Sequence, residues 1–154
     1  MTPDTPGLDE LNKKIVELLQ ADGRRSYASI GREVGLSEAA TRQRVQRLLD
    51  TGVMQIVAVT NPLQLGFRRQ AWVAVKVSGD IEAVADALAG IEEVDYVVIV
   101  AGGPFHVMAE VLCEDDHHLL TLLNRKIHTI TGVDTTEVYT YLELKKQLYN
   151  WGTR

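Results

Sequence analysis

The segment from Ser26 to Asp50 constrains the fold more than any other part of this 154-residue chain. Its apolar residues recur at helical spacing on both sides of Gly35, and Ser37 is a residue type that favours a helix N-cap. Two short helices joined by a tight turn containing glycine predict a helix-turn-helix. The second helix is rich in Arg and Gln, which suits it to the major groove. Double-stranded DNA is therefore the first partner to expect.

The exposed arc of that second helix supplies most of the candidate DNA contacts. Arg can bind guanine in bidentate fashion and Gln can bind adenine, whereas the basic residues ahead of the first of the two helices suit the phosphate backbone. The capping serine and the two residues after it lie at the helix end that enters the groove. The candidate DNA-binding residues are Arg24, Arg25, Ser37, Glu38, Ala39, Arg42, Gln43, Gln46 and Arg47.

Two alternatives to DNA contact stay open on the pattern alone. The Arg- and Gln-rich arc can be an ordinary solvated helix face, and the residues Arg24, Arg25 and Tyr27 can be an ordinary charged turn. Arg44 lies beside Val45, toward the inner edge of the helix. It suits an ion pair with a carboxylate of the same domain as well as it suits DNA.

A net charge of −5 is unexpected for a protein that binds nucleic acid, but the charge is unevenly distributed along the chain. Residues 24–47 contain six Arg against two Glu, so the predicted helix-turn-helix carries a local positive excess although the chain as a whole is acidic. Phosphate binding depends on that local footprint more than on the total.

The remaining composition indicates a soluble protein of the cytoplasm. The chain has no run of about 18 apolar residues and no N-terminal secretory pattern. Its one cysteine, Cys113, excludes an internal disulfide and fits a reducing compartment.

The first 60 residues predict a winged helix-turn-helix. Residues 1–7 contain two Pro and one Gly and are expected to form a flexible tail. A helix follows, capped by Asp9 and ended by Asp22-Gly23. The β-branched run 53–60 predicts a strand or hairpin, which would be the wing, and residues 61–70 are expected to be a linker.

Residues 71–154 predict a second domain with the order β-α-β-β-α-β, which makes the whole chain α+β with a ferredoxin-like C-terminal half. Its helices would cover one face of the sheet and leave an apolar second face, for which a second copy of the chain is the simplest cover. The expected strands are 71–77, 94–100, 105–113 and 135–144, and the expected helices are 80–89 and 116–130.

Several short motifs in a fixed order make the chain resemble the Lrp/AsnC (leucine-responsive, feast/famine) transcription regulators. They are Leu8-Asp9, Asp22-Gly23-Arg24, Gly35-Leu36-Ser37, Arg44-Val45, Arg47-Leu48, Gly52-Val53 and Gly132-Val133. The resemblance implies a C-terminal domain that binds an effector, which in this family is an amino acid or a related molecule. It also implies dimers that often build into octamers. Asn12 stands where the family usually has a second Asp.

The resemblance also assigns an effector loop, which differs here from the usual Thr-Gly-x-x-Asp. The candidate effector-binding residues are Ala101, Gly102, Gly103, Pro104, Phe105 and His106. The glycines suit a tight turn, and the same turn can offer backbone amides to a carboxylate. Since His106 replaces an acidic partner for an ammonium group, we expect a small carboxylate-bearing metabolite as the effector, and an affinity for plain leucine weaker than is usual for the family. The alternative is that His106 points into the sheet.

The sequence offers little support for a metal, a cofactor or catalysis. The residues His106, Cys113, His117, His118 and His128 lack metal-ligand spacing, so no metal is expected. No nucleophile–base pair or cofactor motif is present, so we expect a regulator and not an enzyme. The alternatives are an architectural DNA-compacting protein and, as a weaker option, a small enzyme on a ferredoxin-like domain.

Overall fold

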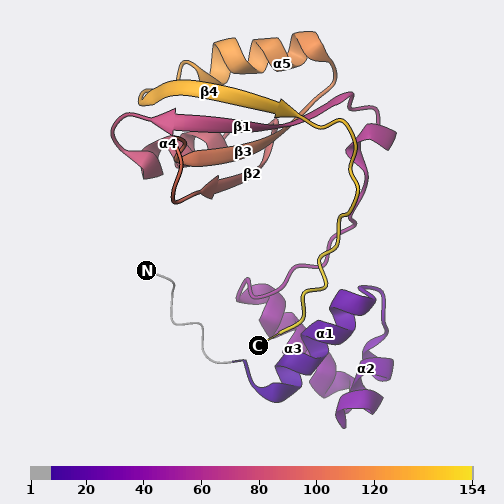
Figure 1. Cartoon of the computed structure of the whole chain (residues 1–154). Helices are drawn as coiled ribbons and strands as arrows, with labels where there is room; N and C mark the ends of the chain where they lie inside the picture. The colour runs from indigo at the N-terminus through magenta and orange to yellow at the C-terminus, as the bar shows by residue number, and fades with distance from the viewer. Residues whose placement is uncertain (1–7, 154) are drawn as a thin grey trace. The chain divides into compact units, whose positions relative to one another are not determined.

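The computed structural model describes residues 8–153, so the N-terminal tail expected over residues 1–7 lies outside the described residues. The chain divides into two compact units. The first comprises the residues up to Val59 together with the segment from Lys146 onward, and the second comprises Thr60–Lys145 (Figure 1).

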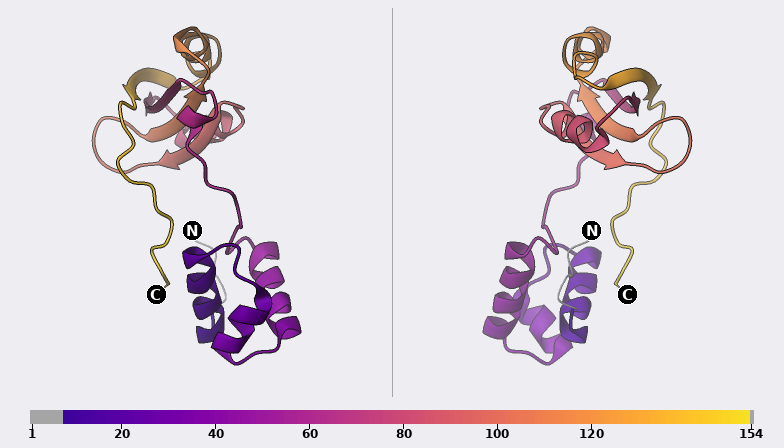
Figure 2. Two further views of the ribbon diagram at one scale, coloured as in Figure 1. Left: turned by 90° about the vertical axis from the view of Figure 1, so that its right-hand side faces the viewer. Right: turned by 90° about the vertical axis from the view of Figure 1, so that its left-hand side faces the viewer.

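Three helices form the N-terminal unit: α1 (Glu10–Ala21), α2 (Tyr27–Val34) and α3 (Glu38–Asp50). Figure 2 shows them packed as one small bundle. Asp9 caps α1 by accepting from the Asn12 amide (2.7 Å), and Ser37 caps α3 by accepting from the Ala40 amide (3.2 Å). Both caps confirm the sequence-based expectation. The buried core residues of this unit are Ile15, Val16, Leu18, Leu19, Ile30, Val45 and Leu48.

The turn between α2 and α3 depends on close backbone packing. Gly35 ends α2 in the left-handed conformation (φ 74°), which glycine adopts without steric cost. One turn earlier, a Cβ on Gly31 would lie 2.6 Å from the backbone oxygen of Leu36. The buried Thr41 donates its hydroxyl to the Ser37 carbonyl (3.0 Å), so it has a partner inside the unit. These contacts fix the angle at which α3 leaves the turn.

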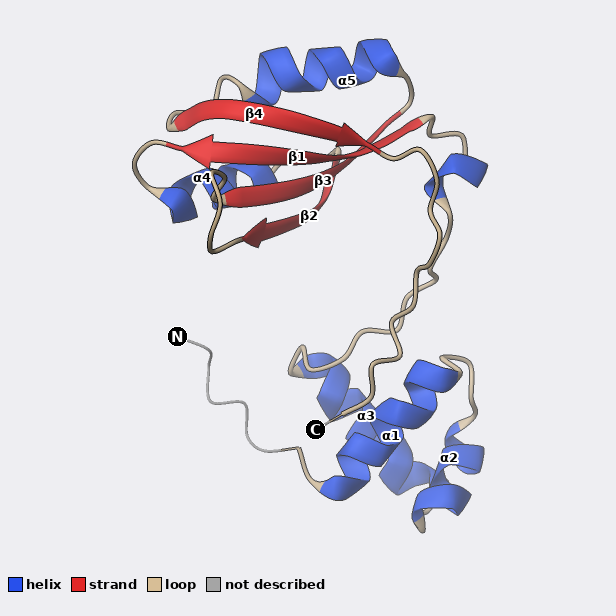
Figure 3. Ribbon diagram, in the orientation of Figure 1, coloured by secondary structure: helices blue, strands red, loops and turns tan. Residues whose placement is uncertain are grey.

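The β ribbon expected over residues 53–60 does not form within the described chain. The segment after α3 is loop up to η1, a 3-10 turn at Pro62–Gln64, and it pairs with no strand (Figure 3). Val57 and Val59 are more than half exposed. β-branched residues favour an extended backbone, but a strand also needs a neighbour to accept its hydrogen bonds, and none is present here. The helix-turn-helix was predicted correctly, but the wing was not.

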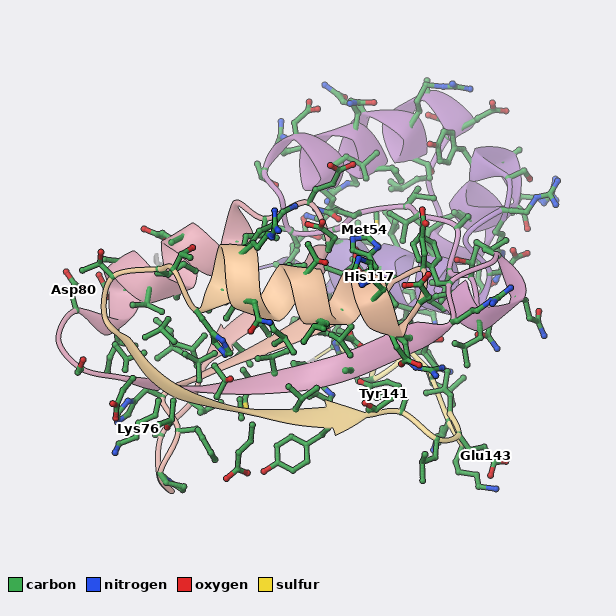
Figure 4. The ribbon with its side chains drawn as sticks, turned by 90° about the horizontal axis from the view of Figure 1, so that it is seen from above. Met54, Lys76, Asp80, His117, Tyr141 and Glu143 are labelled. Carbon is green, nitrogen blue, oxygen red and sulfur yellow. The ribbon has the colours of Figure 1, made fainter. Side chains whose placement is uncertain are left out.

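The second unit contains a four-stranded antiparallel sheet in the order β2-β3-β1-β4. The order of its elements along the chain is βαββαβ, which confirms the ferredoxin-like prediction. The elements are β1 (Arg69–Val77), α4 (Ile81–Ala89), β2 (Val94–Ile99), β3 (Val107–Cys113), α5 (Asp116–Leu122), the π-helical turn η2 (Leu123–Ile127) and β4 (Val133–Thr140). Asp80 caps α4 (Figure 4).

Most boundaries of the second unit agree with the expectation to within two residues, and three differ by more. β4 ends at Thr140 and not at residue 144, and the helix expected over 116–130 changes to π geometry at Leu123. The residues after Lys145, which were expected in the C-terminal domain, group with the N-terminal unit. There the Gly152 amide donates to Gln20 on α1 (3.0 Å), and the Thr153 hydroxyl donates to Glu17 (2.8 Å).

The two faces of the sheet differ in what covers them. One face packs against α4, α5 and η2 and forms a core that includes Val73, Val75, Val84, Leu88, Val107, Val111, Leu122 and Ile127. On the other face one row crosses all four strands, and its members in strand order are Tyr96, Glu110, Trp72 and Tyr139. The Tyr96 and Trp72 rings meet edge to face at 5.8 Å. This second face, called the open face below, has no helix over it.

Candidate DNA-binding surface and effector loop

The exposed side of α3 forms a shallow hollow of about 490 Å³. Five of the nine candidate DNA-binding residues line it. The lining residues are Ala39, Arg42, Gln43, Gln46, Arg47 and Asp50. The structure therefore brings the predicted arc together as one surface, which the helical spacing alone had indicated. Asp50 was not predicted as a member of this surface.

Arg42 is held from two sides at this hollow. Its Nη2 donates to a Glu38 carboxylate oxygen one turn back (3.1 Å). Its guanidinium also lies over the ring of Tyr27, with 5.1 Å to the ring centroid. The sequence had suggested phosphate contact for Tyr27, and its stacking under Arg42 was missed because the two residues lie on different helices.

The other polar side chains of α3 differ in whether they already have a hydrogen-bond partner. Gln46 donates to Asp50 on the next turn (2.8 Å), so its amide is already engaged. Gln43 and Arg47 are exposed, and neither side chain makes a hydrogen bond or ion pair within residues 8–153. Gln43 and Arg47 are thus the side chains on this helix that are most available to a ligand.

The candidates ahead of α2 also divide into free and engaged residues. Arg24 is exposed, and its guanidinium has no partner among the described residues. Arg25 forms an ion pair with Glu33 and donates to the Ser29 hydroxyl (3.3 Å). A phosphate would have to compete with Glu33 for Arg25, so Arg24 is the better candidate for a backbone contact.

Arg44 serves the interior of the unit. Its Nη1 donates to Asp9 and to Asn12 (3.0 Å), which joins α3 to the start of α1. The hydrogen bond from Arg44 lowers the pKa of Asp9. Of the two roles that the sequence left open for Arg44, the structure shows the ion pair. Asn12 supplies the second acceptor at the position where an Asp is more usual.

The candidate effector loop is a glycine turn between β2 and β3. Gly102 (φ 87°) and Gly103 (φ 73°) both adopt the left-handed region, and nothing lies within 4 Å of where their side chains would be. Residues 101–104 are exposed, and Phe105 and His106 are half-buried. The predicted residues therefore form one accessible turn, with His106 at its base.

His106 is tied to the sheet through its ring. The Val77 amide at the end of β1 donates to Nδ1 of His106 (3.0 Å). Because a backbone amide can only donate, Nδ1 carries no proton and the neutral ring carries its proton on Nε2. The structure thus agrees with the alternative in which His106 points to the sheet, because Nδ1 bonds to β1. Nε2 remains as a hydrogen-bond donor.

Comparison with known proteins places both halves of the chain. The AsnC-type helix-turn-helix domain matches residues 8–49, and the C-terminal dimeric alpha+beta barrel domain of AsnC-type regulators matches residues 67–154. An HTH-type transcriptional regulator of Pyrococcus furiosus is 36% identical over 147 residues, which cover 94% of this chain and 96% of that protein. The chain belongs to the Lrp/AsnC family.

Other Lrp/AsnC regulators are similar along nearly the whole chain. The proline dehydrogenase transcriptional activator of Rhizobium radiobacter is 31% identical over 148 residues, with 93% of this chain and 94% of that protein covered. The crystal structure of the leucine response regulatory protein of Mycobacterium tuberculosis superposes with a TM-score of 0.81 at 29% identity, covering 91% of this chain and 96% of that one. The chain is accordingly a DNA-binding transcriptional regulator of the Lrp/AsnC type.

Two histidines and one glutamate of the second unit of this Lrp/AsnC chain take part in structural contacts. Glu93 accepts from Lys126 (2.6 Å) and lies 3.2 Å from the His118 ring. The Lys126 hydrogen bond is the main cause that lowers the pKa of Glu93 to about 2. His128 contacts the Thr136 hydroxyl (2.8 Å). Over residues 8–153, no group of three or more His, Cys, Asp and Glu side chains is arranged to hold a metal ion.

Within the same described range, no helix is long and apolar enough to cross a membrane.

Proposed function

We propose that the chain is a sequence-specific transcription regulator whose DNA binding responds to a small carboxylate-bearing metabolite. The observation that carries the DNA part is the hollow along α3, where Arg42, Gln43 and Arg47 are presented together. Arg and Gln are the side chains that discriminate guanine and adenine in the major groove. The caps and close turn around α3 hold this surface rigidly, as base readout requires.

A division of labour within the DNA surface follows from which side chains are free. Arg42 and Gln43 lie in the first half of α3, the part of a recognition helix that meets base edges. Arg24 and Arg25 precede α2, the helix that crosses the backbone in this motif. We assign base contacts to the first pair and phosphate contacts to the second.

Selection of bound sequences from random DNA, followed by binding at matched salt, tests this assignment. Arg42→Ala and Gln43→Ala should weaken binding to the selected operator by about 1–3 kcal/mol each and binding to random DNA much less. Arg24→Ala should weaken both alike, since phosphate contacts carry no sequence information. Arg25→Ala should act in the same direction with a smaller effect, because Glu33 already engages it. Unchanged operator affinity in all four variants would show that the recognition face lies elsewhere.

The effector part of the proposal rests on the turn at residues 101–106. Its two glycines leave the backbone open to close approach, and the neutral His106 ring carries a donor on Nε2. Amide and imidazole donors suit a carboxylate, and the turn offers no acidic side chain for an ammonium group. The relatives named for a leucine response and for proline dehydrogenase activation fit an effector from amino-acid metabolism.

Calorimetry on the full chain distinguishes the possible effectors. Titrations with leucine and with its keto-acid counterpart, on wild type and on His106→Asp, should show preference for the keto acid in the wild type and a shift toward leucine in the variant. Tight leucine binding by the wild type that is unchanged by the substitution would contradict a role for His106. The same titrations repeated with the selected DNA present would report whether the metabolite alters operator affinity.

We further propose that the working form is a dimer joined through the open faces of two sheets, with larger assemblies such as octamers built from it. The matching C-terminal domain is described as dimeric, and the open face of this chain carries three aromatic rings without a helix to cover them.

A further inference from the structure

The contacts of Arg42 identify two residues that set its orientation. Tyr27 is the first residue of α2, and it packs with its partly buried ring against the core of the N-terminal unit. The ring is therefore fixed by the fold and not by the guanidinium above it. Glu38 is the first residue of α3, and the helix places its carboxylate one turn from Arg42.

Neither contact by itself holds the Arg42 guanidinium strongly, because both are exposed to water. The Arg42 and Glu38 side chains are 63% and 54% exposed, and exposed ion pairs of this kind are weak. An exposed cation–π contact corresponds to about a twofold to fivefold bias. Together, however, they restrict a side chain that otherwise samples many rotamers. A guanidinium with one face on a ring and one donor on a carboxylate has a defined plane.

A defined plane matters for a base and not for a phosphate. Bidentate binding of guanine O6 and N7 needs two parallel N–H donors in the plane of the base, whereas a phosphate accepts from many directions. Glu38 engages one of the five N–H donors of Arg42, which leaves the others for a base. Arg47, one turn and a residue further along α3, has no such partners within residues 8–153.

We propose that Tyr27 and Glu38 are positioning residues that hold Arg42 for bidentate recognition of a single guanine, so that each half-site contains one G·C pair that depends on all three residues. This inference rests on the proposed function, because it takes α3 as the helix that reads bases. It adds the identity of one base pair and two residues that need not touch DNA.

The test measures a discrimination ratio with the full chain. The ratio compares affinity for the selected operator with affinity for the same DNA in which the G·C pairs of each half-site are replaced by A·T, one pair at a time. Tyr27→Leu should lower this ratio about threefold to tenfold, and Tyr27→Phe should preserve it, because the Phe ring keeps its π face. Glu38→Ala should lower the ratio similarly, and this residue makes no core contact that would threaten folding.

Two further readouts separate positioning from a general loss of binding. The dependence of affinity on salt should stay the same in the Tyr27 and Glu38 variants, since no phosphate contact is removed. Arg24→Ala, which removes a proposed phosphate contact, is the control; it should reduce the salt dependence and leave the ratio intact.

The outcomes separate this inference from the function on which it rests. If Arg42→Ala abolishes the ratio while Tyr27→Leu and Glu38→Ala leave it at the wild-type value, the positioning roles are wrong and the DNA-reading role of α3 stands. If Arg42→Ala itself leaves the ratio unchanged, the assignment of α3 as the base-reading surface fails. Reduced ratios in all three variants, with the ratio restored by Tyr27→Phe, support the inference.

Discussion

The single thiol of the chain is protected by the fold. Cys113 ends β3 with its side chain in the core between sheet and helices, and burial raises its pKa to about 11. Because the thiolate is the reactive form, such a thiol is almost entirely protonated and unreactive near neutral pH. It is better understood as a small apolar core residue than as a redox sensor.

Alkylation kinetics test this directly. At pH 8 the native protein should react with iodoacetamide at least about a hundredfold more slowly than the urea-unfolded chain, because its thiolate fraction is about a hundredfold lower. The unfolded chain serves as the matched control. Equal rates in the two states would mean that Cys113 is accessible and ionised in the native protein.

Glu93 couples pH to stability through its partners Lys126 and His118. Its pKa is lowered to about 2 from an ordinary value near 4.5, so the ionised form is favoured in the folded state. A depressed pKa contributes stability that is fully present above about pH 4.5 and is lost as the pH falls toward 2. The contribution is about 1–3 kcal/mol after allowance for partial solvation.

Urea unfolding between pH 7 and pH 2.5 checks this expectation. Glu93→Gln should lower the free energy of unfolding at pH 7 and should flatten its decline between pH 4.5 and pH 2.5. Glu82→Gln, on the exposed side of α4, is the control and should leave the curve as in the wild type. A Glu93 variant with the wild-type pH dependence would contradict the assignment.

A side-chain contact can be predicted from the sequence only when its partner lies a few residues away. Asp9 and Ser37 each accept a hydrogen bond from the amide three residues ahead, and such local contacts can be predicted from residue type and spacing. Arg44 reaches Asp9 across 35 residues, so spacing could only leave its two roles open. The Tyr27–Arg42 contact and the His106–Val77 hydrogen bond also join different elements, and both needed the fold.

At the scale of elements, the helix-turn-helix depends on one position without a side chain. A Cβ at Gly31 would meet the Leu36 carbonyl at 2.6 Å and the Thr41 hydroxyl at 3.0 Å. Both belong to the turn and to the start of α3, so relief would require α3 to move. Helix propensity favours Ala over Gly by about 1 kcal/mol, but overpacking of this kind typically costs more.

Gly31→Ala should therefore destabilise the protein by about 1–3 kcal/mol and weaken operator binding beyond the stability loss. Thermal unfolding and DNA titration measure the two effects. Gly23→Ala is the matched control, since its nearest contact would be at 3.8 Å, and it should change stability by less than about 1 kcal/mol. Equal behaviour of the two variants would show that the turn tolerates a wider spacing.

Periodicity predicted the type and order of the elements better than their ends. In the second unit, β1, β3 and α4 bury most of the core residues, and their apolar spacing is visible in the sequence. The prediction of a wing was wrong because the β-branched residues of 53–60 favour an extended backbone but do not show whether another strand pairs with it. The π turn at Leu123–Ile127 has no signature in the apolar spacing, so the helix was expected to continue.

At the scale of the whole molecule, the open face sets the expected assembly. Its row contains three aromatic residues and one carboxylate, in the order Tyr96, Glu110, Trp72 and Tyr139. Gln70 (2.7 Å) and the Tyr141 hydroxyl just past β4 (2.7 Å, Figure 4) both donate to Oε1 of Glu110. One oxygen of this carboxylate therefore keeps two hydrogen bonds from its own chain when a second copy covers the face.

Sedimentation equilibrium tests the dimer. The wild type should be dimeric at micromolar concentration, and Trp72→Ala should raise the dimer dissociation constant at least about tenfold, because a central aromatic residue is lost from the interface. Leu120→Ser removes an exposed apolar side chain from α5 and should leave the dimer intact. A wild-type monomer at these concentrations would rule out the open face as an interface.

The sequence could not show where the last residues belong, because their contacts span more than 130 positions. Gly152 and Thr153 reach back to Gln20 and Glu17, and nothing in the local pattern of residues 146–153 indicates a partner on α1. Fold class and element order come from patterns within each domain, whereas this contact joins segments that are far apart in the sequence.

The contact between residues 152–153 and α1 matters for the design of fusions and fragments. The polypeptide leaves the first compact unit at Val59 and returns to it at Lys146, so Thr60–Lys145 is inserted within that unit. A fusion partner or affinity tag placed next to Gly152 and Thr153 would lie beside α1 and could disturb these two contacts. Excising residues 1–60 as an isolated DNA-binding fragment would leave α1 without the segment that its Glu17 and Gln20 side chains engage.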